Sequence, residues 1–327
     1  MQAGAVPIAL IAMVFTAEQA RHRAGMTRRI RFNAFAMNCV AHQSPGLWRH
    51  PEDQSSRYTD LTYWTELAKL LERGRFDGLF LADVLGTYDV YGGNHDAALR
   101  QGAQVPVSDP LLLASAMAAV TEHLGFGITA GTAFEHPYPF ARRLSTLDHL
   151  TNGRIGWNVV TGYLPRPRGT WARTTNSSTT IATTTRTSTS SSLQVVGNVV
   201  EDDAVVRDRT TGVYTDPAKV HPIEHEGKHF TVPGIHISEP SPQRTPVIFQ
   251  AGASPRGVRF AAANAEAIFV GAPTKAILKD TVARIRNELT KVGRDPYSAR
   301  IYTLLTIITD RTPSWPRRSS GLPQLRE

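Results

Sequence analysis

The fold is decided by one short stretch, Arg75-Phe76-Asp77-Gly78-Leu79-Phe80-Leu81-Ala82-Asp83. It is an apolar run that follows an amphipathic segment and ends on a carboxylate. A short apolar run bounded by Gly and Asp is typical of a parallel strand that is covered on both faces. Because ligands bind at the carboxyl ends of such strands, Asp83 is a candidate site residue.

Strands and helices alternate on both sides of this stretch. Thr59–Arg73 has one apolar face at helical spacing, and Thr59 or Asp60 can cap it. Besides Phe76–Asp83, strands are expected at Ile30–Met37, Phe126–Thr132, Ile155–Thr161, Pro246–Ala251, Ala267–Gly271 and Arg300–Thr309, with helices at Leu111–His123, Pro139–Leu150, Ser254–Asn264 and Thr274–Val292, and a hairpin at His221–Phe230 and Val232–Ile237. Seven such strands predict an α/β fold, a (β/α)8 TIM-type barrel whose eighth repeat is missing. The first and last strands would then be unpaired edges.

The positive charge is concentrated in three segments. The formal net charge is +8, but residues 1–31, 164–200 and 311–327 carry +4, +4 and +3, which leaves the rest of the chain at −3. A mildly acidic body argues against nucleic-acid binding. Residues 1–25 are interpreted as an N-terminal extension, because no basic residue precedes their apolar centre as a secretory signal would require.

One internal segment breaks the alternation. Between Thr174 and Ser192, fifteen of nineteen residues are Ser or Thr. Such a segment cannot bury enough apolar surface to offset the entropy of ordering it, so residues 165–200 are expected to form a disordered insert. Residues 311–327, rich in Pro, Ser and Arg, are expected to be an aberrant tail.

Cysteine content and hydropathy bear on the compartment. Among 327 residues there is a single cysteine, Cys39, which excludes an internal disulfide and suits a cytoplasmic location. No run approaches the roughly 18 apolar residues of a membrane span, so no membrane association is expected.

Several ordered motifs carry a resemblance to a known family. They lie at Asn33–Cys39, Gly46–Pro51, Tyr58–Leu61, Phe80–Asp83, Trp157–Thr161, Pro240–Pro246 and Gln250–Ser254. Together they resemble the bacterial luciferase-like flavin-dependent monooxygenases, and within them the nitrilotriacetate and long-chain alkane monooxygenase group. The resemblance implies a luciferase-like barrel over residues 26–310. It lapses at Pro165–Val200, which looks like a local change of reading frame, and again after Asp310.

The resemblance also implies an activity. A separate NADH:FMN reductase would supply reduced FMN, which reacts with O2 to oxygenate a small organic substrate such as an alkane or an aminopolycarboxylate. A homodimer or higher homo-oligomer is implied for an intact chain. Two alternatives stay open: a damaged, inactive copy of such an enzyme, and a deazaflavin-dependent dehydrogenase of the same superfamily, which the alkane-type N-terminal motifs disfavour.

The FMN-binding positions implied by the resemblance are Asp83, Thr129, Asn158, Gly252, Ala253 and Ser254. Ser254 opens a helix, where backbone N–H groups and the helix dipole attract phosphate; an ordinary N-cap is the alternative. Asp83 could instead cap a loop, and Thr129 and Asn158 could instead satisfy backbone groups of the barrel.

The resemblance places Cys39, His42, Tyr88 and Gln104 on the substrate side of the flavin, as the catalytic set. Cys39 is more simply interpreted as a small buried residue than as a nucleophile. The position of a family pocket histidine holds Tyr163 here. His221, His225 and His229 are spaced four apart, as zinc ligands on a helix would be. No metal site is expected, because Pro222 and Gly227 disfavour a helix there.

Overall fold

A computed structural model describes the backbone of residues 9–12, and residues 30–40, 42–132, 135–160, 197–227, 229–251 and 254–305 in full. The predicted disordered insert, apart from residues 197–200, and the predicted aberrant tail lie outside these ranges. Among the described helices, none is long and apolar enough to cross a membrane.

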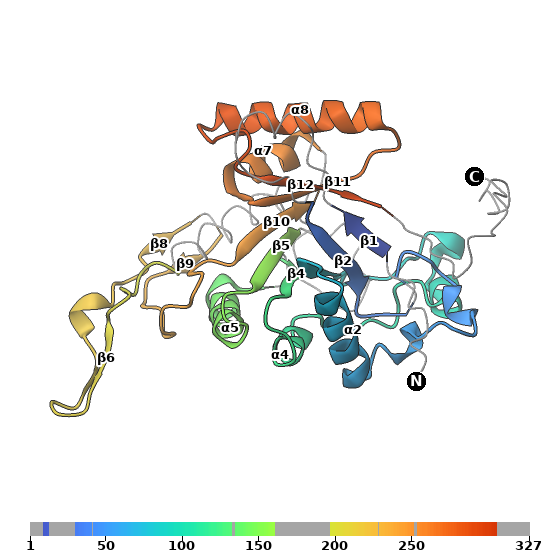
Figure 1. Ribbon diagram of the computed structural model, residues 1–327. Coiled ribbons are helices and arrows are strands. Elements are labelled where there is room, and N and C mark those ends of the chain that lie inside the picture. Colours follow the sequence, from blue (N-terminus) through green and yellow to red (C-terminus); the bar gives the residue numbers. More distant parts are fainter. Residues whose placement is uncertain are drawn as a thin grey trace.

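A closed barrel organises the molecule (Figure 1), with strands in the order β1-β12-β11-β10-β5-β4-β3-β2. In the part of the chain that the structure describes, seven strands run parallel: β2 (Phe32–Met37), β3 (Gly78–Ala82), β4 (Gly125–Gly131), β5 (Ile155–Val160), β10 (Val247–Ala251), β11 (Ala267–Val270) and β12 (Arg300–Leu304). Each lies within a predicted strand or within one residue of it, so the predicted TIM-type barrel is confirmed. Parallel strands bring their carboxyl ends to one end of the barrel.

The barrel is closed by a strand that was not predicted. β1 (Ala9–Ala12) lies antiparallel between β2 and β12, with Leu10 opposite Ala34 and Ile11 opposite Leu304. The expectation that the first and last parallel strands are unpaired edges is therefore wrong. The physical reason is that any short extended segment can satisfy the exposed N–H and C=O groups of an edge, whatever its direction.

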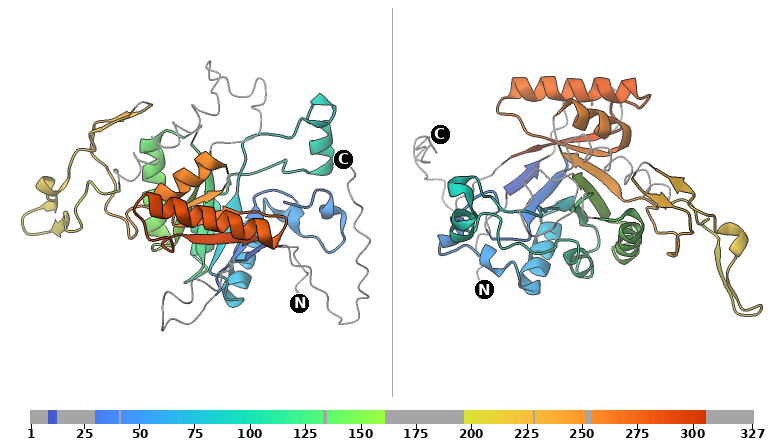
Figure 2. Two further views of the ribbon diagram at one scale, coloured as in Figure 1. Left: turned by 90° about the horizontal axis from the view of Figure 1, so that it is seen from above. Right: turned by 180° about the vertical axis from the view of Figure 1, so that it is seen from behind.

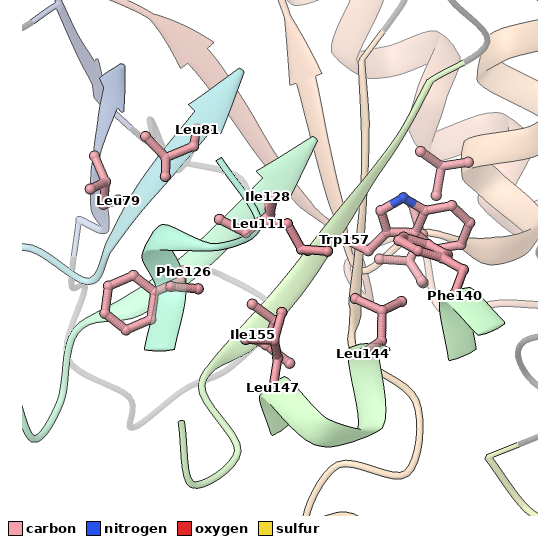
Figure 3. Close-up of a cluster of buried hydrophobic side chains, with 14 of the residues drawn as sticks. Leu79, Leu81, Leu111, Phe126, Ile128, Phe140, Leu144, Leu147, Ile155 and Trp157 are labelled. Atoms are coloured by element: carbon pink, nitrogen blue, oxygen red, sulfur yellow. The ribbon is translucent and has the colours of Figure 1, made fainter. Parts of the chain in front are cut away.

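Within the described ranges, the helices that cover the barrel are α2 (Leu61–Arg73), α4 (Leu113–Ala118), α5 (Pro137–Leu150), α7 (Pro255–Asn264) and α8 (Lys275–Lys291). In Figure 1, α2, α4 and α5 lie along one side of the barrel, and α7 and α8 lie on the opposite side. Between α5 and strands β3 to β5, side chains such as Phe126, Phe140 and Trp157 form the main buried cluster (Figure 3).

Helix α4 is shorter than the predicted Leu111–His123. Beyond it, the Glu72 carboxylate accepts hydrogen bonds from the backbone N–H groups of Glu122, His123 and Leu124. Desolvation by burial acts to raise the pKa of Glu72, but these hydrogen bonds outweigh it and lower the pKa below its usual value. A side chain from α2 therefore takes over the backbone donors that a longer α4 would have used.

An arm of two small hairpins extends away from the barrel (Figures 1 and 2). One hairpin joins β6 (Val205–Asp208) to β7 (Val213–Thr215) and was not predicted. The other joins β8 (His225–Glu226) to β9 (Thr231–Val232) and lies at the predicted hairpin.

Aromatic rings fill the barrel interior. Phe80, Phe249, Phe269 and Tyr302 contact one another, and Phe80 also contacts Phe35. We call this cluster of five rings the aromatic floor. It fits inside the barrel only because small residues face it. A Cβ on Gly127 would lie 2.9 Å from Phe80 and a Cβ on Gly156 would lie 2.4 Å from Phe249.

Gly156→Ala is therefore expected to destabilise the protein by about 1–3 kcal/mol, because the new methyl group overpacks the floor. Urea denaturation measures this free energy of unfolding. Gly234→Ala is the matched control, since nothing lies within 4 Å of the methyl group it adds. Equal stabilities of the two variants would contradict the close approach of Phe249.

Candidate functional site

The candidate site residues lie at the carboxyl ends of five parallel strands. Cys39 and His42 follow β2, Asp83 follows β3, and Ser254 follows β10. Thr129 and Asn158 lie inside β4 and β5, near their ends, and pair in register. The structure thus brings these predicted positions to one end of the barrel, whereas Gly252 and Ala253 lie outside the described residues.

Thr129 and Asn158 form a buried polar pair. Each side chain is 4 % exposed, and the Asn158 amide nitrogen donates to the Thr129 hydroxyl at 2.9 Å. The Asn158 side-chain oxygen is buried and has no hydrogen-bond partner among the described residues. Because a buried acceptor without a donor costs about 1–3 kcal/mol, this oxygen marks a place where a ligand donor would be favourable.

Asp83 has a perturbed acidity. Desolvation by burial raises its pKa to about 6, and the charge of Asp109 contributes in the same direction. A hydrogen bond from the Val84 backbone N–H opposes this shift. An acid of this kind, at a strand end of a barrel, is a candidate functional group.

Cys39 lies beside Asp83 and is 3 % exposed. Burial, reinforced by the Asp83 charge, raises the pKa of its thiol to about 12. The thiol is therefore protonated at neutral pH. This chemistry fits a small buried side chain and does not fit a thiolate nucleophile.

His42 stands against the aromatic floor. Its ring meets that of Phe35 edge-on, with 4.6 Å between the centroids. Burial lowers the pKa of His42 to about 4, so the ring is neutral at pH 7. Its Nδ1 is buried and has no partner among the described residues, which leaves one ring nitrogen available to a ligand.

Tyr88 and Gln104 come together from distant parts of the segment between β3 and α4. The Tyr88 hydroxyl donates to the Gln104 side-chain oxygen at 3.3 Å. The backbone of Gln104 has a positive φ of 56°, in the left-handed region. The Val105–Pro106 bond that follows is cis.

Ser254 is the N-cap of α7, and its hydroxyl accepts from the Gly257 N–H at 3.1 Å. The first turn of α7 contains no acidic residue. The helix start is therefore compatible with an anion, although the capping bond alone accounts for the serine.

Asn38 was not singled out from the sequence. It is 3 % exposed, its amide nitrogen donates to the Asp109 carbonyl at 3.3 Å, and its side-chain oxygen has no partner among the described residues. Its place directly after β2 was the available signal, because polar residues at strand ends are candidates in such barrels.

The part of the chain that the structure describes contains no group of three or more His, Cys, Asp or Glu residues placed to hold a metal ion. At the strand ends of the described barrel, the buried side-chain atoms without a partner include the amide oxygens of Asn38 and Asn158 and the Nδ1 of His42, which suit an uncharged, hydrogen-bonding ring better than a cation.

The sequence profile of the luciferase-like monooxygenases matches residues 30–319. The chain belongs to this family. Long-chain alkane monooxygenase of Geobacillus thermodenitrificans is 52% identical over 291 residues, which cover 88% of this chain and 66% of that protein. The solved structure of long-chain alkane monooxygenase has a TM-score of 0.83 to this chain, at 52% identity, and the match covers 85% of this chain and 64% of that one.

Two further similar proteins have different substrates in their names. Dimethyl-sulfide monooxygenase of Hyphomicrobium sulfonivorans is 53% identical over 295 residues, covering 87% of this chain and 59% of that protein. A riboflavin lyase, solved with modified FMN and riboflavin, matches with a TM-score of 0.77 at 37% identity, covering 84% of this chain and 62% of that one. The chain thus spans 59–66% of the length of the two curated relatives.

The described residues fit a flavin. Above the aromatic floor, β3 and β10 end in the small side chains Ala82 and Ala251, and β4 and β5 contribute the Thr129–Asn158 pair. A flat ring binds to a surface of small apolar side chains that leave space for it, with a few polar groups placed to bond its edge.

Proposed function

We propose that this chain is the oxygenating component of an FMN-dependent, two-component monooxygenase. The observation that carries the proposal is the buried, unpartnered Asn158 oxygen beside Thr129, at the ligand-binding end of a luciferase-like barrel. A ring N–H of FMN would satisfy this oxygen. The reduced flavin would supply the electrons for the reaction with O2.

Each candidate residue then has a role that its environment supports. Asp83, Thr129 and Asn158 would hold the flavin ring, and the start of α7 at Ser254, with Gly252 and Ala253, would hold its phosphate. His42, Tyr88 and Gln104 would orient the substrate and donate or accept hydrogen bonds. Cys39 would line the pocket as a protonated thiol.

The charge state of the substrate side favours an uncharged substrate. At neutral pH the Cys39 thiol and the His42 ring are both uncharged, and Gln104 carries no charge. An aminopolycarboxylate would need cations to pair with its carboxylates. We therefore propose an apolar substrate, in the class of an alkane or an organic sulfide.

The two alternatives have less support. Relatives at 52% and 53% identity are named monooxygenases, which gives no support to a deazaflavin-dependent dehydrogenase. No observation on the described residues favours a catalytically inactive copy.

The proposal predicts that oxygenated product forms only when a flavin reductase is present. The protein is incubated with FMN, NADH, O2 and either hexadecane or dimethyl sulfide, with and without an added NADH:FMN reductase, and product is quantified by gas chromatography. Product from NADH without reductase would contradict the two-component reaction. Failure to bind FMN in a fluorescence titration would contradict the flavin site itself.

A further inference from the structure

Two loops beside the candidate site are joined at an inner contact. The β2 loop comprises residues 38–40 and 42–60. The β3 loop comprises residues 83–112 and contains the short helix α3 (Asp96–Gln101), which ends at Gly102. Cys39 and Val107 form an isolated antiparallel bridge, and the Ser108 N–H donates to the Asn38 carbonyl at 2.8 Å. The inner contact therefore fixes the end of the β3 loop against the end of β2.

The same loops meet again at an outer contact, farther along the β2 loop. The Trp48 indole N–H donates to the Gln101 carbonyl at 2.9 Å, and the Arg49 guanidinium donates to the Gln101 side-chain oxygen at 2.7 Å. Arg49 also lies 5.0 Å from the centre of the Trp48 ring. One short helical turn, Leu47–Arg49, thus holds Gln101 by both its backbone and its side chain.

Gly102 completes the outer contact. It has a φ of 65°, and a Cβ at this position would lie 2.8 Å from Val40 Cγ1 and 3.3 Å from Trp48 Nε1. Only a glycine allows the loops to approach so closely in this conformation. The outer contact, formed by Trp48, Arg49, Gln101 and Gly102, is therefore a fitted surface.

Gln104 lies between the two contacts in the β3 loop, and His42 lies between them in the β2 loop. The backbone of Gln104 is left-handed, with a φ of 56°, a conformation that costs a non-glycine residue about 1–2 kcal/mol. Its side chain meets the Tyr88 hydroxyl. Because the conformation is intrinsically unfavourable, its surroundings must impose it.

We propose that Trp48 and Arg49 are positioning residues, which hold Gln101 and Gly102 and so fix Gln104 and Tyr88 beside the carboxyl ends of β2 and β3. This inference rests on the proposed function for its catalytic consequence. Groups that orient a substrate act only within a narrow range of geometry. If the outer contact were loosened, more of the O2 consumed would end as hydrogen peroxide and less of it would be used to form product.

The test uses two matched pairs of variants. Arg49→Gln is compared with Arg100→Gln, which removes a charge nearby in the same region that makes an exposed contact at 3.9 Å with Asp96. Gly102→Ala is compared with Gly212→Ala, which also has a positive φ but has nothing within 4 Å of the added methyl group. Trp48→Phe removes the indole donor and keeps an aromatic ring.

Two readouts separate the inference from the proposed function. The first readout is hydrogen exchange at the N–H groups of Ala103 and Gln104, which donate to the carbonyls of Ala98 and Gly102. It can be measured whether or not the protein is an active enzyme. It is expected to accelerate about tenfold in Arg49→Gln, Trp48→Phe and Gly102→Ala, and to stay unchanged in both controls. With hexadecane or dimethyl sulfide, product formed per O2 consumed is expected to fall about three- to tenfold in the same variants, while total O2 consumption is retained.

Unchanged exchange in all three variants would overturn the inference, whatever the activity. Faster exchange with no fall in the product formed per O2 consumed would also overturn it, since the outer contact would then be merely structural. If wild type and Arg100→Gln form no product at all, the proposed function fails, and the exchange measurement still decides whether the outer contact holds Gln104.

Discussion

Replacing Asp83 with asparagine is expected to stabilise the FMN-free protein at pH 8 and to leave it nearly unchanged at pH 4. Because the pKa of Asp83 is raised from 3.8 to about 6, the folded state binds its proton more tightly than the unfolded state does. Ionisation therefore destabilises the fold as pH rises between these values. Asparagine removes the charge, keeps an acceptor for the Val84 N–H, and should gain about 1–3 kcal/mol at pH 8.

The same site should lose its ligand when the acceptor is removed. Asp83→Ala is expected to weaken FMN binding about tenfold or more, the equivalent of one lost hydrogen bond to a charged group. Thermal and urea unfolding at pH 4 and pH 8, with an FMN titration at pH 8, measure both effects. A gain in stability together with a loss of FMN affinity is expected of a functional residue, because groups placed for a ligand are often unfavourable for the fold alone.

Asp280→Asn is the control, since it removes an exposed carboxylate from α8. It should alter neither the pH dependence of unfolding nor FMN affinity. If Asp83→Asn changes stability by the same amount at both pH values, burial of its charge is not the cause. If Asp83→Ala binds FMN as tightly as wild type, Asp83 does not belong to the flavin site.

The second large effect is expected from removing β1. A chain beginning at Met26 lacks Ala9–Ala12 and leaves edges on β2 and β12 without their antiparallel partner. Losing several hydrogen bonds, each with a net value of about 0.5–1.5 kcal/mol, should destabilise the barrel by about 2–5 kcal/mol. The exposed Ile301-Tyr302-Thr303-Leu304 edge should also promote association between chains.

A chain beginning at Ile8 keeps β1 and is the matched control. Urea unfolding and size-exclusion chromatography with light scattering compare the two, and Ile11→Pro in the full chain tests the pairing without truncation. A Met26 chain that is monodisperse and as stable as the control would show that β1 contributes nothing to barrel closure.

The sequence by itself determined the order of strands and helices and the barrel class. Apolar runs such as Leu79–Leu81 and caps such as Asp60 are local signals, and each acts through its own neighbours in the chain. It also indicated the candidate position Asp83, because a residue at the end of a parallel strand lies at the ligand-binding end in any such barrel. Thr129 and Asn158 came from the family resemblance of the motifs. Their roles toward FMN stay predictions.

Only the tertiary structure decided how the barrel closes, where α4 ends and which groups meet between the loops. β1 pairs with Leu304, nearly the whole described chain away, and the Glu72 carboxylate replaces helix hydrogen bonds some fifty residues later. The acidity of Asp83 depends on its burial and on Asp109, and the Trp48 indole donates to the carbonyl of Gln101, 53 residues later in the chain. These features arise from contacts between residues far apart in sequence, and neither periodicity nor composition encodes which distant partners will meet.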